Sequence, residues 1–161
     1  MEKLKISEVA PYLPYGLKLN IICKPAFKNR DNIVTVETWN ISDVQQPFQK
    51  RYSVLSVKPI LRPLSDLIKE IEVDGEKFVP IEKLFELNHP THKAKEYYYT
   101  VVPNWVECSH VSTAIQFRFY LNDYFGNNYT TVSQLIKWHF DVFGLIEKGL
   151  AININTLNDE K

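Results

Sequence analysis

The sequence has 161 residues, 45% of them hydrophobic and 24% charged, which is the balance of a globular protein and not of a disordered chain. Nineteen basic and nineteen acidic side chains give a formal net charge of zero, so no overall field attracts nucleic acid or an anionic membrane. The length suits one domain with a substantial core, and we expect a single α+β domain over residues 1–161.

The sequence shows neither the apolar region of a signal peptide nor a run long enough to cross a membrane, which predicts a cytoplasmic protein without membrane contact. Its two cysteines, Cys23 and Cys108, lie in different apolar stretches without paired spacing. We therefore expect free thiols in a reducing compartment and no disulfide.

The first third of the chain predicts a short helix followed by three antiparallel strands. Ser7 is the candidate N-cap of a helix over "EVAPYL", and Pro14 and Gly16 are expected to stop that helix. Segments rich in β-branched and aromatic residues then predict a meander that ends at Lys58-Pro59. Its strands are expected at 17–22, 33–39 and 51–57.

The middle of the chain predicts two short helices around a hairpin. Proline begins each amphipathic segment, 63–71 and 80–87, at the position where a helix best tolerates it. Between them, Asp74-Gly75 is a strong signal for a two-residue hairpin turn.

Aromatic residues dominate the chain from Glu96 onwards. The segments "YYYTVV", "WVECSHVS" and "AIQFRFYL" predict a second set of antiparallel strands. A helix remains an alternative for 113–125, because Phe117, Leu121 and Tyr124 also share a helical face.

The last expected helix spans 131–143 and is the longest. Thr131 and Gln134 have the spacing of a capping box, and His139 falls on the apolar face that follows. Asp141 is about 200° further round such a helix, so the two side chains are not expected to form a catalytic dyad. We expect His139 to be a core histidine, and Gly144 to end the helix in the left-handed conformation.

Four residues offer groups that zinc accepts: His89, His92, Cys108 and His110. Their spacing matches no common zinc motif, so no metal is expected. "HPT" and "HVS" resemble the two His-x-Thr/Ser motifs of the 2H phosphoesterase family, but the histidines are 21 positions apart and Pro90 fits poorly in a central strand. Since no phosphate-binding loop or nucleophile elbow is present either, we expect no catalytic residue and no cofactor.

The segment 85–130 carries more aromatic and charged side chains than packing requires. Exposed tyrosine, tryptophan and arginine are typical of protein interfaces. The candidate partner-binding residues are Tyr97, Tyr98, Tyr99, Trp105 and Arg118.

Three segments of the chain contain the motifs "APYLPYGLK" from residue 10, "KPILRPLSDL" from 58 and "HFDVFGLIEKGLAIN" from 139. These segments resemble small uncharacterised accessory proteins of Bacteroidales phages, prophages and mobile elements. The resemblance implies an origin and a shared framework, with variable segments at 19–57 and 85–137. It transfers no activity and no catalytic residue.

Two functions follow as expectations. The first is a non-enzymatic accessory protein that binds a host or phage protein in the bacterial cytosol, and inhibition of a host defence component is one form of it. The second is a small-ligand or nucleotide-handling protein, either a sequestering binder or a phosphoesterase-like hydrolase, that uses the His89 to His110 region. Zero net charge and the missing catalytic motifs favour the first function, with nucleic acid not an expected partner. The oligomeric state is left open.

Overall fold

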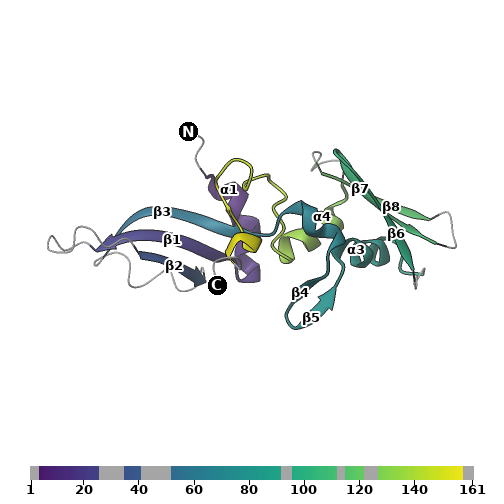
Figure 1. Ribbon diagram of the computed structural model, residues 1–161, viewed down its shortest axis with the longest axis horizontal. Coiled ribbons are helices and arrows are strands. Elements are labelled where there is room, and N and C mark those ends of the chain that lie inside the picture. Colours follow the sequence, from purple (N-terminus) through teal and green to yellow (C-terminus); the bar gives the residue numbers. More distant parts are fainter. Residues whose placement is uncertain are drawn as a thin grey trace. The chain divides into compact units, whose positions relative to one another are not determined.

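The computed structural model describes residues 4–25, 35–40, 52–91, 96–111, 115–121 and 127–157 (Figure 1). Helices and mostly antiparallel sheets occupy separate segments, which confirms the α+β class. The chain groups into two compact units, one formed by residues 1–62 with 143–161 and the other by residues 63–142. We call them unit 1 and unit 2, and the expectation of one domain stays a prediction.

Unit 1 begins with the short helix α1, Ile6–Val9, which continues directly into the 3-10 helix Ala10–Tyr15. Lys5 is the N-cap and not Ser7, because the Lys5 backbone N–H donates to the Glu8 carboxylate at 3.0 Å. Gly16 ends the pair of helices with a φ of 70°, as the sequence indicated.

The sheet of unit 1 contains β1 (Lys18–Pro25), β2 (Thr35–Asn40), β3 (Tyr52–Leu61) and β9 (Ile152–Asn153) in the order β2-β1-β3-β9. β1 pairs antiparallel with both β2 and β3, so it is central, whereas a meander would place β2 there. The short β9 pairs parallel with β3 at Ile60 and Leu61.

β3 does not end at Lys58-Pro59, because Pro59 is paired with Leu19 inside the strand. Among the described residues, β9 pairs with β3 only from Ile60 onwards, so β3 is an edge strand at Pro59. An edge position is where a strand tolerates the missing N–H of proline.

Unit 2 begins with the 3-10 helix Leu64–Ile68, which is shorter than the helix expected at 63–71. The hairpin of β4 (Ile71–Val73) and β5 (Glu76–Phe78) follows. Asp74 and Gly75 have φ angles of 52° and 82°, the pair of positive values that a type I′ turn requires. The helix α3, Pro80–Asn88, then starts at the predicted proline.

The sheet of unit 2 consists of β6 (Tyr97–Val102), β7 (Trp105–His110) and β8 (Gln116–Tyr120), all antiparallel. Residues 116–120 are therefore a strand and not the alternative helix. Phe117 and Phe119 are buried while Gln116 and Arg118 are exposed, which is the alternation of a strand with one core face.

The helix α4, Tyr129–Lys137, begins two residues earlier than the predicted 131 and ends six residues before the predicted 143. Its N-cap is Asn128 and not Thr131, because the Asn128 side chain accepts the Thr131 N–H at 2.8 Å. No helix among the described residues has the length and apolar character needed to cross a membrane.

His139 ends α4 in place of Gly144. Its φ is 60°, its N–H donates to the Ile136 carbonyl at 2.9 Å, and the Phe140 N–H donates to the Leu135 carbonyl at 2.9 Å. This pair of bonds is a Schellman motif with His139 at the left-handed position that glycine usually occupies. His139 is thus half-buried beyond the helix and not on its apolar stripe, and the 200° argument about Asp141 no longer applies.

Candidate functional site

The sheet β6-β7-β8 has two faces of different character (Figure 1). The inner face packs against α3 and α4 around a core that includes Phe85, Val106, Phe119 and Leu135. The outer face is formed by the alternate side chains, which follow from the register of the three strands. They are Tyr98, Thr100, Val102, Trp105, Glu107, Ser109, Gln116, Arg118 and Tyr120.

The candidate partner-binding residues divide between these two faces. Tyr98, Trp105 and Arg118 belong to the outer face, whereas Tyr97 and Tyr99 belong to the inner face. The five residues were predicted as one group, but only Tyr98, Trp105 and Arg118 share the outer face.

A charged pair lies at the centre of the outer face. The Arg118 guanidinium donates from Nε and Nη2 to Glu107 Oε2, at 3.0 and 2.7 Å, and lies 4.2 Å from the centre of the Trp105 ring. Ser109 Oγ donates to the other oxygen of Glu107 at 3.2 Å. The hydrogen bond to Glu107, followed by one to Tyr120, raises the pKa of Arg118. Arg118 is therefore a fixed, permanently charged group stacked on an aromatic ring.

Exposed aromatic side chains surround this pair. Tyr98 is 56% exposed and Tyr120 38% exposed, while Trp105 is half-buried under Arg118. Tyr98, Ser109 and Gln116 also line a shallow hollow of about 520 Å³ at the end of the sheet nearest His110. The outer face thus combines aromatic area, hydrogen-bonding groups and one neutralised charge pair, which is the composition of a protein interface.

The inner-face tyrosines connect β6 to α3. The Tyr99 hydroxyl donates to Glu82, and the Tyr97 hydroxyl donates to Glu86 at 3.3 Å. Burial, followed by the bond to Glu82, raises the pKa of Tyr99. The ring of Tyr97 packs edge-on against Phe85, with 5.4 Å between ring centroids. These two tyrosines therefore anchor β6 to the helix.

The metal-ligand candidates are dispersed over different elements. His89 is the C-cap residue of α3, while Cys108 and His110 share the inner face of β7. Burial, followed by the charges of Glu82 and Glu107, raises the pKa of Cys108 to about 12, so its thiol is a poor ligand and nucleophile. The described part of the chain contains no group of three His, Cys, Asp or Glu residues that could hold a metal. His92 lies outside the described residues, so the expectation of no metal stays a prediction.

The histidine pattern of the 2H phosphoesterases is not reproduced. His110 lies on β7, but His89 follows α3 and is not on a strand. The likeness of "HPT" to that family's motif therefore does not extend to its position in the fold.

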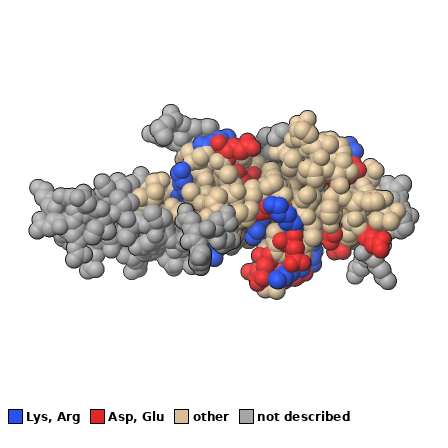
Figure 2. All heavy atoms as spheres, viewed as in Figure 1, with Lys and Arg blue, Asp and Glu red and all other residues tan. Residues whose placement is uncertain are grey.

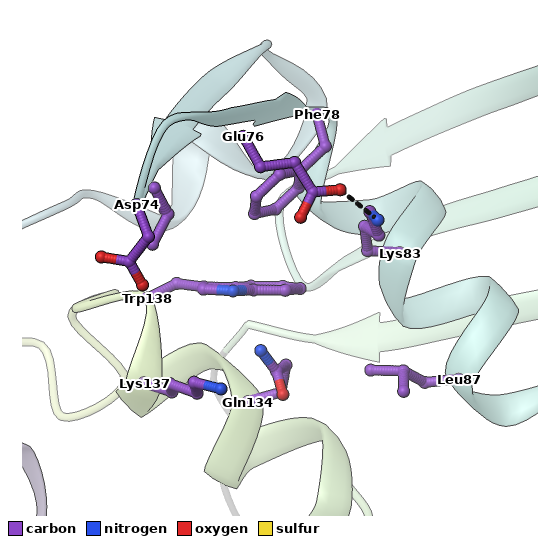
Figure 3. A pocket seen from close by; sticks show the side chains of 9 residues that line it. Asp74, Glu76, Phe78, Lys83, Leu87, Gln134, Lys137 and Trp138 are labelled. Atoms are coloured by element: carbon purple, nitrogen blue, oxygen red, sulfur yellow. Dashed lines mark hydrogen bonds and ion pairs between the residues drawn. The ribbon is translucent and has the colours of Figure 1, made fainter. Parts of the chain in front are cut away.

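Sequence reasoning did not identify a second hollow, of about 310 Å³, between the β4-β5 hairpin, α3 and α4 (Figure 3). In its lining, the ring centroids of Phe78 and Trp138 are 4.9 Å apart, and Lys83 Nζ contacts Glu76 at 2.6 Å. Charged side chains gather on this hairpin (Figure 2). The lining comes from three separate segments, so no local motif signals it.

Comparison with known proteins finds no matching family, no similar curated protein and no similar solved structure.

Sequence reasoning also missed Glu107, the acidic partner of Arg118. Its signal is the position opposite Arg118 in an antiparallel pair, which is visible only once the register of β7 and β8 is known.

Proposed function

We propose that the protein acts by binding a macromolecular partner, most directly another protein, through the outer face of the β6-β7-β8 sheet. The observation that carries this proposal is Arg118, which is hydrogen-bonded to Glu107 and lies 4.2 Å from the centre of the Trp105 ring. Two exposed tyrosines, Tyr98 and Tyr120, belong to the same face. A side chain that is already ordered loses little conformational freedom when a partner contacts it.

Electrostatics favour a protein over a nucleic acid as the partner. Glu107 neutralises Arg118, and the other outer-face side chains are uncharged at neutral pH. Exposed tyrosines such as Tyr98 and Tyr120 are side chains on which bases can stack, but phosphate binding depends on uncompensated lysine and arginine. The zero net charge of the whole chain adds no attraction.

The biological setting of the proposal comes from the sequence resemblance. An accessory protein of a phage or mobile element acts in the host cytosol, and its partner is then a host or phage protein. Inhibition of a host defence component is one such role. The outer face falls within 85–137, the segment in which the resemblance implies variation, which suits a surface adapted to different targets.

A second candidate is a small-ligand or nucleotide-handling protein, and the hollow between the hairpin, α3 and α4 favours it. Its volume of about 310 Å³ is at the lower end of ligand sites. Phe78 offers an aromatic surface, and Lys83 and Lys137 offer cations, although Asp74 and Glu76 balance their charge. A thermal-shift screen against nucleotides tests this candidate, because a ligand of the folded state raises the melting temperature.

Affinity capture from a host lysate, followed by quantitative binding to the protein identified, tests the main proposal. We expect Tyr98→Ala to weaken that binding by about 1 to 2 kcal/mol. Tyr129→Ala is the matched control, because Tyr129 is 84% exposed but belongs to α4 and not to the outer face of the sheet. Equal binding by the two variants and the wild type would show that the outer face is not the contact surface.

A further inference from the structure

We propose that β6 accepts an extended segment of the partner protein as an additional strand, and that this segment carries basic residues at alternate positions. The proposal rests on the proposed binding function and specifies how the partner is engaged. It concerns the open edge of β6, meaning the side of the strand that faces away from β7. In the described part of the chain, no strand pairs with β6 on that side.

The backbone hydrogen bonds of the sheet determine which groups point to the open edge. The Leu121 N–H donates to the Asn104 carbonyl at 2.8 Å and the His110 N–H donates to the Ile115 carbonyl at 3.2 Å, so the even-numbered residues of β7 bond to β8. The odd-numbered residues of β7 consequently bond to β6. The bond from the Val111 N–H to the Glu96 carbonyl, at 3.3 Å, agrees with this alternation.

By this alternation the odd-numbered residues of β6, among them Tyr99 and Val101, direct their backbone groups to the open edge. Glu107 is paired with Thr100, so Thr100 exchanges hydrogen bonds with β7. The N–H and C=O groups of the neighbours Tyr99 and Val101 must point the other way. Their side chains are 38% and 55% exposed, so the edge is accessible at both positions.

The outer strands β8 and β6 differ in how their open edges are protected from pairing. At β8, the Asn127 side chain satisfies both backbone groups of Tyr120, because it accepts the Tyr120 N–H at 2.9 Å and donates to the Tyr120 carbonyl at 2.8 Å. β6 has no charge, proline or register shift of the kind that protects an edge strand. Its sequence, Tyr-Tyr-Tyr-Thr-Val-Val, consists of strong strand formers. An edge of this kind pairs readily with an added strand.

The charges beside β6 indicate the chemistry of that strand. Glu82 and Glu86 of α3 reach Tyr99 and Tyr97 respectively, and Glu96 precedes β6. The two tyrosines are separated by the i, i+2 repeat of one strand face, which is about 7 Å. An added strand with lysine or arginine at i and i+2 would place its cations beside Glu82 and Glu86. Lys93 and Lys95 lie outside the described residues. The acidic group of Glu82, Glu86 and Glu96 is therefore stated for the described residues only.

The same charges argue against a second copy of the chain as the occupant. Two β6 strands paired around a two-fold axis would form one continuous sheet with both inner faces on the same side. The Glu82 and Glu86 side chains of one copy would then lie next to those of the other copy, and like charges repel. A basic segment of another protein relieves this repulsion, whereas a second copy adds to it.

Hydrogen–deuterium exchange on the full chain tests the proposal with a seven-residue peptide of alternating valine and lysine as the probe. In the free protein, we expect the Tyr99 and Val101 amides to exchange quickly and the Thr100 amide to exchange slowly. The peptide, at about 1 mM, should slow exchange at Tyr99 and Val101. The same peptide with glutamate in place of lysine should not. Protection by both peptides alike, or by neither, overturns the proposal.

Backbone and charge variants sharpen this test. Val101→Pro removes an edge-directed N–H without breaking a bond to β7, so the variant should fold and bind the lysine peptide about tenfold more weakly. Val101→Thr keeps the N–H and is the matched control. Glu82→Gln keeps the acceptor for Tyr99 and should weaken binding about fivefold. Unchanged affinity in Val101→Pro and Glu82→Gln overturns the proposal.

Three further outcomes bear on this inference, and the last two separate it from the proposed function. A dimer of the free chain that Val101→Pro converts to a monomer identifies the occupant as a second copy and overturns the proposal. If Tyr98→Ala weakens binding of the captured partner while Val101→Pro does not, the outer face is the contact surface and the strand-addition mode is wrong. If Val101→Pro weakens binding and Tyr98→Ala does not, the edge is used without the outer face.

Discussion

The two faces of the β6-β7-β8 sheet contain residues of equally low exposure for different reasons. Phe117, on the inner face, is 8% exposed because the apolar core covers it, and Glu107, on the outer face, is 7% exposed. Glu107 is covered by the side chains that bind it, chiefly Arg118. Low exposure in a central strand therefore identifies either a core residue or the buried half of a surface ion pair. Only the side chains that contact the residue distinguish these two cases.

The largest expected effect comes from truncating the inner face. Phe119→Ala removes a side chain that is 3% exposed and should lower the free energy of unfolding by about 3 to 5 kcal/mol, since it leaves a cavity in the core. Gln116→Ala, on the exposed outer face of the same strand, should change it by less than about 0.5 kcal/mol. Urea denaturation of both variants measures the contrast. Similar losses would mean that the outer face also supports the fold by packing.

The next effect tests the ion pair of the outer face. Arg118→Ala leaves the Glu107 carboxylate, whose side chain is 9% exposed, without its cation and should lower the midpoint of urea denaturation. In a Glu107→Gln background the same substitution should lower the midpoint less, because no buried charge is left without its partner. The double-mutant cycle gives the coupling energy, and a coupling near zero would contradict the structural role assigned to the pair.

A smaller effect on the free energy of unfolding is expected at alkaline pH, from Cys108 on the inner face. Burial raises the pKa of Cys108 to about 12 from its ordinary value of 9.0, so the folded state holds the thiol proton that the unfolded state releases. The stability that this bound proton contributes is fully present below pH 9 and is lost as the pH rises towards 12. The free energy of unfolding should fall by roughly 1 to 2 kcal/mol between pH 9 and about pH 11.

Cys108→Ala supplies the control for that pH dependence. The variant is expected to be less stable at pH 7, because it leaves a small cavity, but to lose less stability between pH 9 and about pH 11. The folded wild type should also resist alkylation of Cys108 at pH 8. Rapid alkylation without unfolding would show that the inner face is more open than the structure indicates.

Local sequence signals predicted which elements unit 2 contains. They predicted less well where these elements begin and end, and which face of the sheet each residue occupies. Asp74-Gly75 and Pro80 sit at the turn and helix start that their chemistry predicts. The limits of α4 were missed because Asn128 and Thr131 are both good caps, and only the folded chain selects between them. The faces of β6 could not be assigned because tyrosine occupies both of them.

Non-local pairing was the other information that the sequence lacked. Three strands in succession predict a meander, but β1 is central because it pairs with both β2 and β3. The order depends on contacts between distant segments, for which hydrophobic alternation gives no signal. Glu107 was missed as a site residue for the same reason, since its partner is eleven positions away on the next strand.

The smallest expected effect lies where α4 ends beneath the inner face. His139 has a φ of 60°, a conformation in which a Cβ atom is unfavourable, and the bonds around it direct Phe140 into the core of unit 2. His139→Gly relieves the backbone cost, whereas His139→Ala removes the imidazole but keeps the Cβ. The glycine variant should therefore be more stable than the alanine variant by about 0.5 to 1 kcal/mol. His139→Val should be the least stable of the three because its branched Cβ is the most crowded at positive φ. Thermal unfolding of the three variants measures this order, and an alanine variant as stable as the glycine variant would mean that the left-handed end of α4 carries no backbone strain.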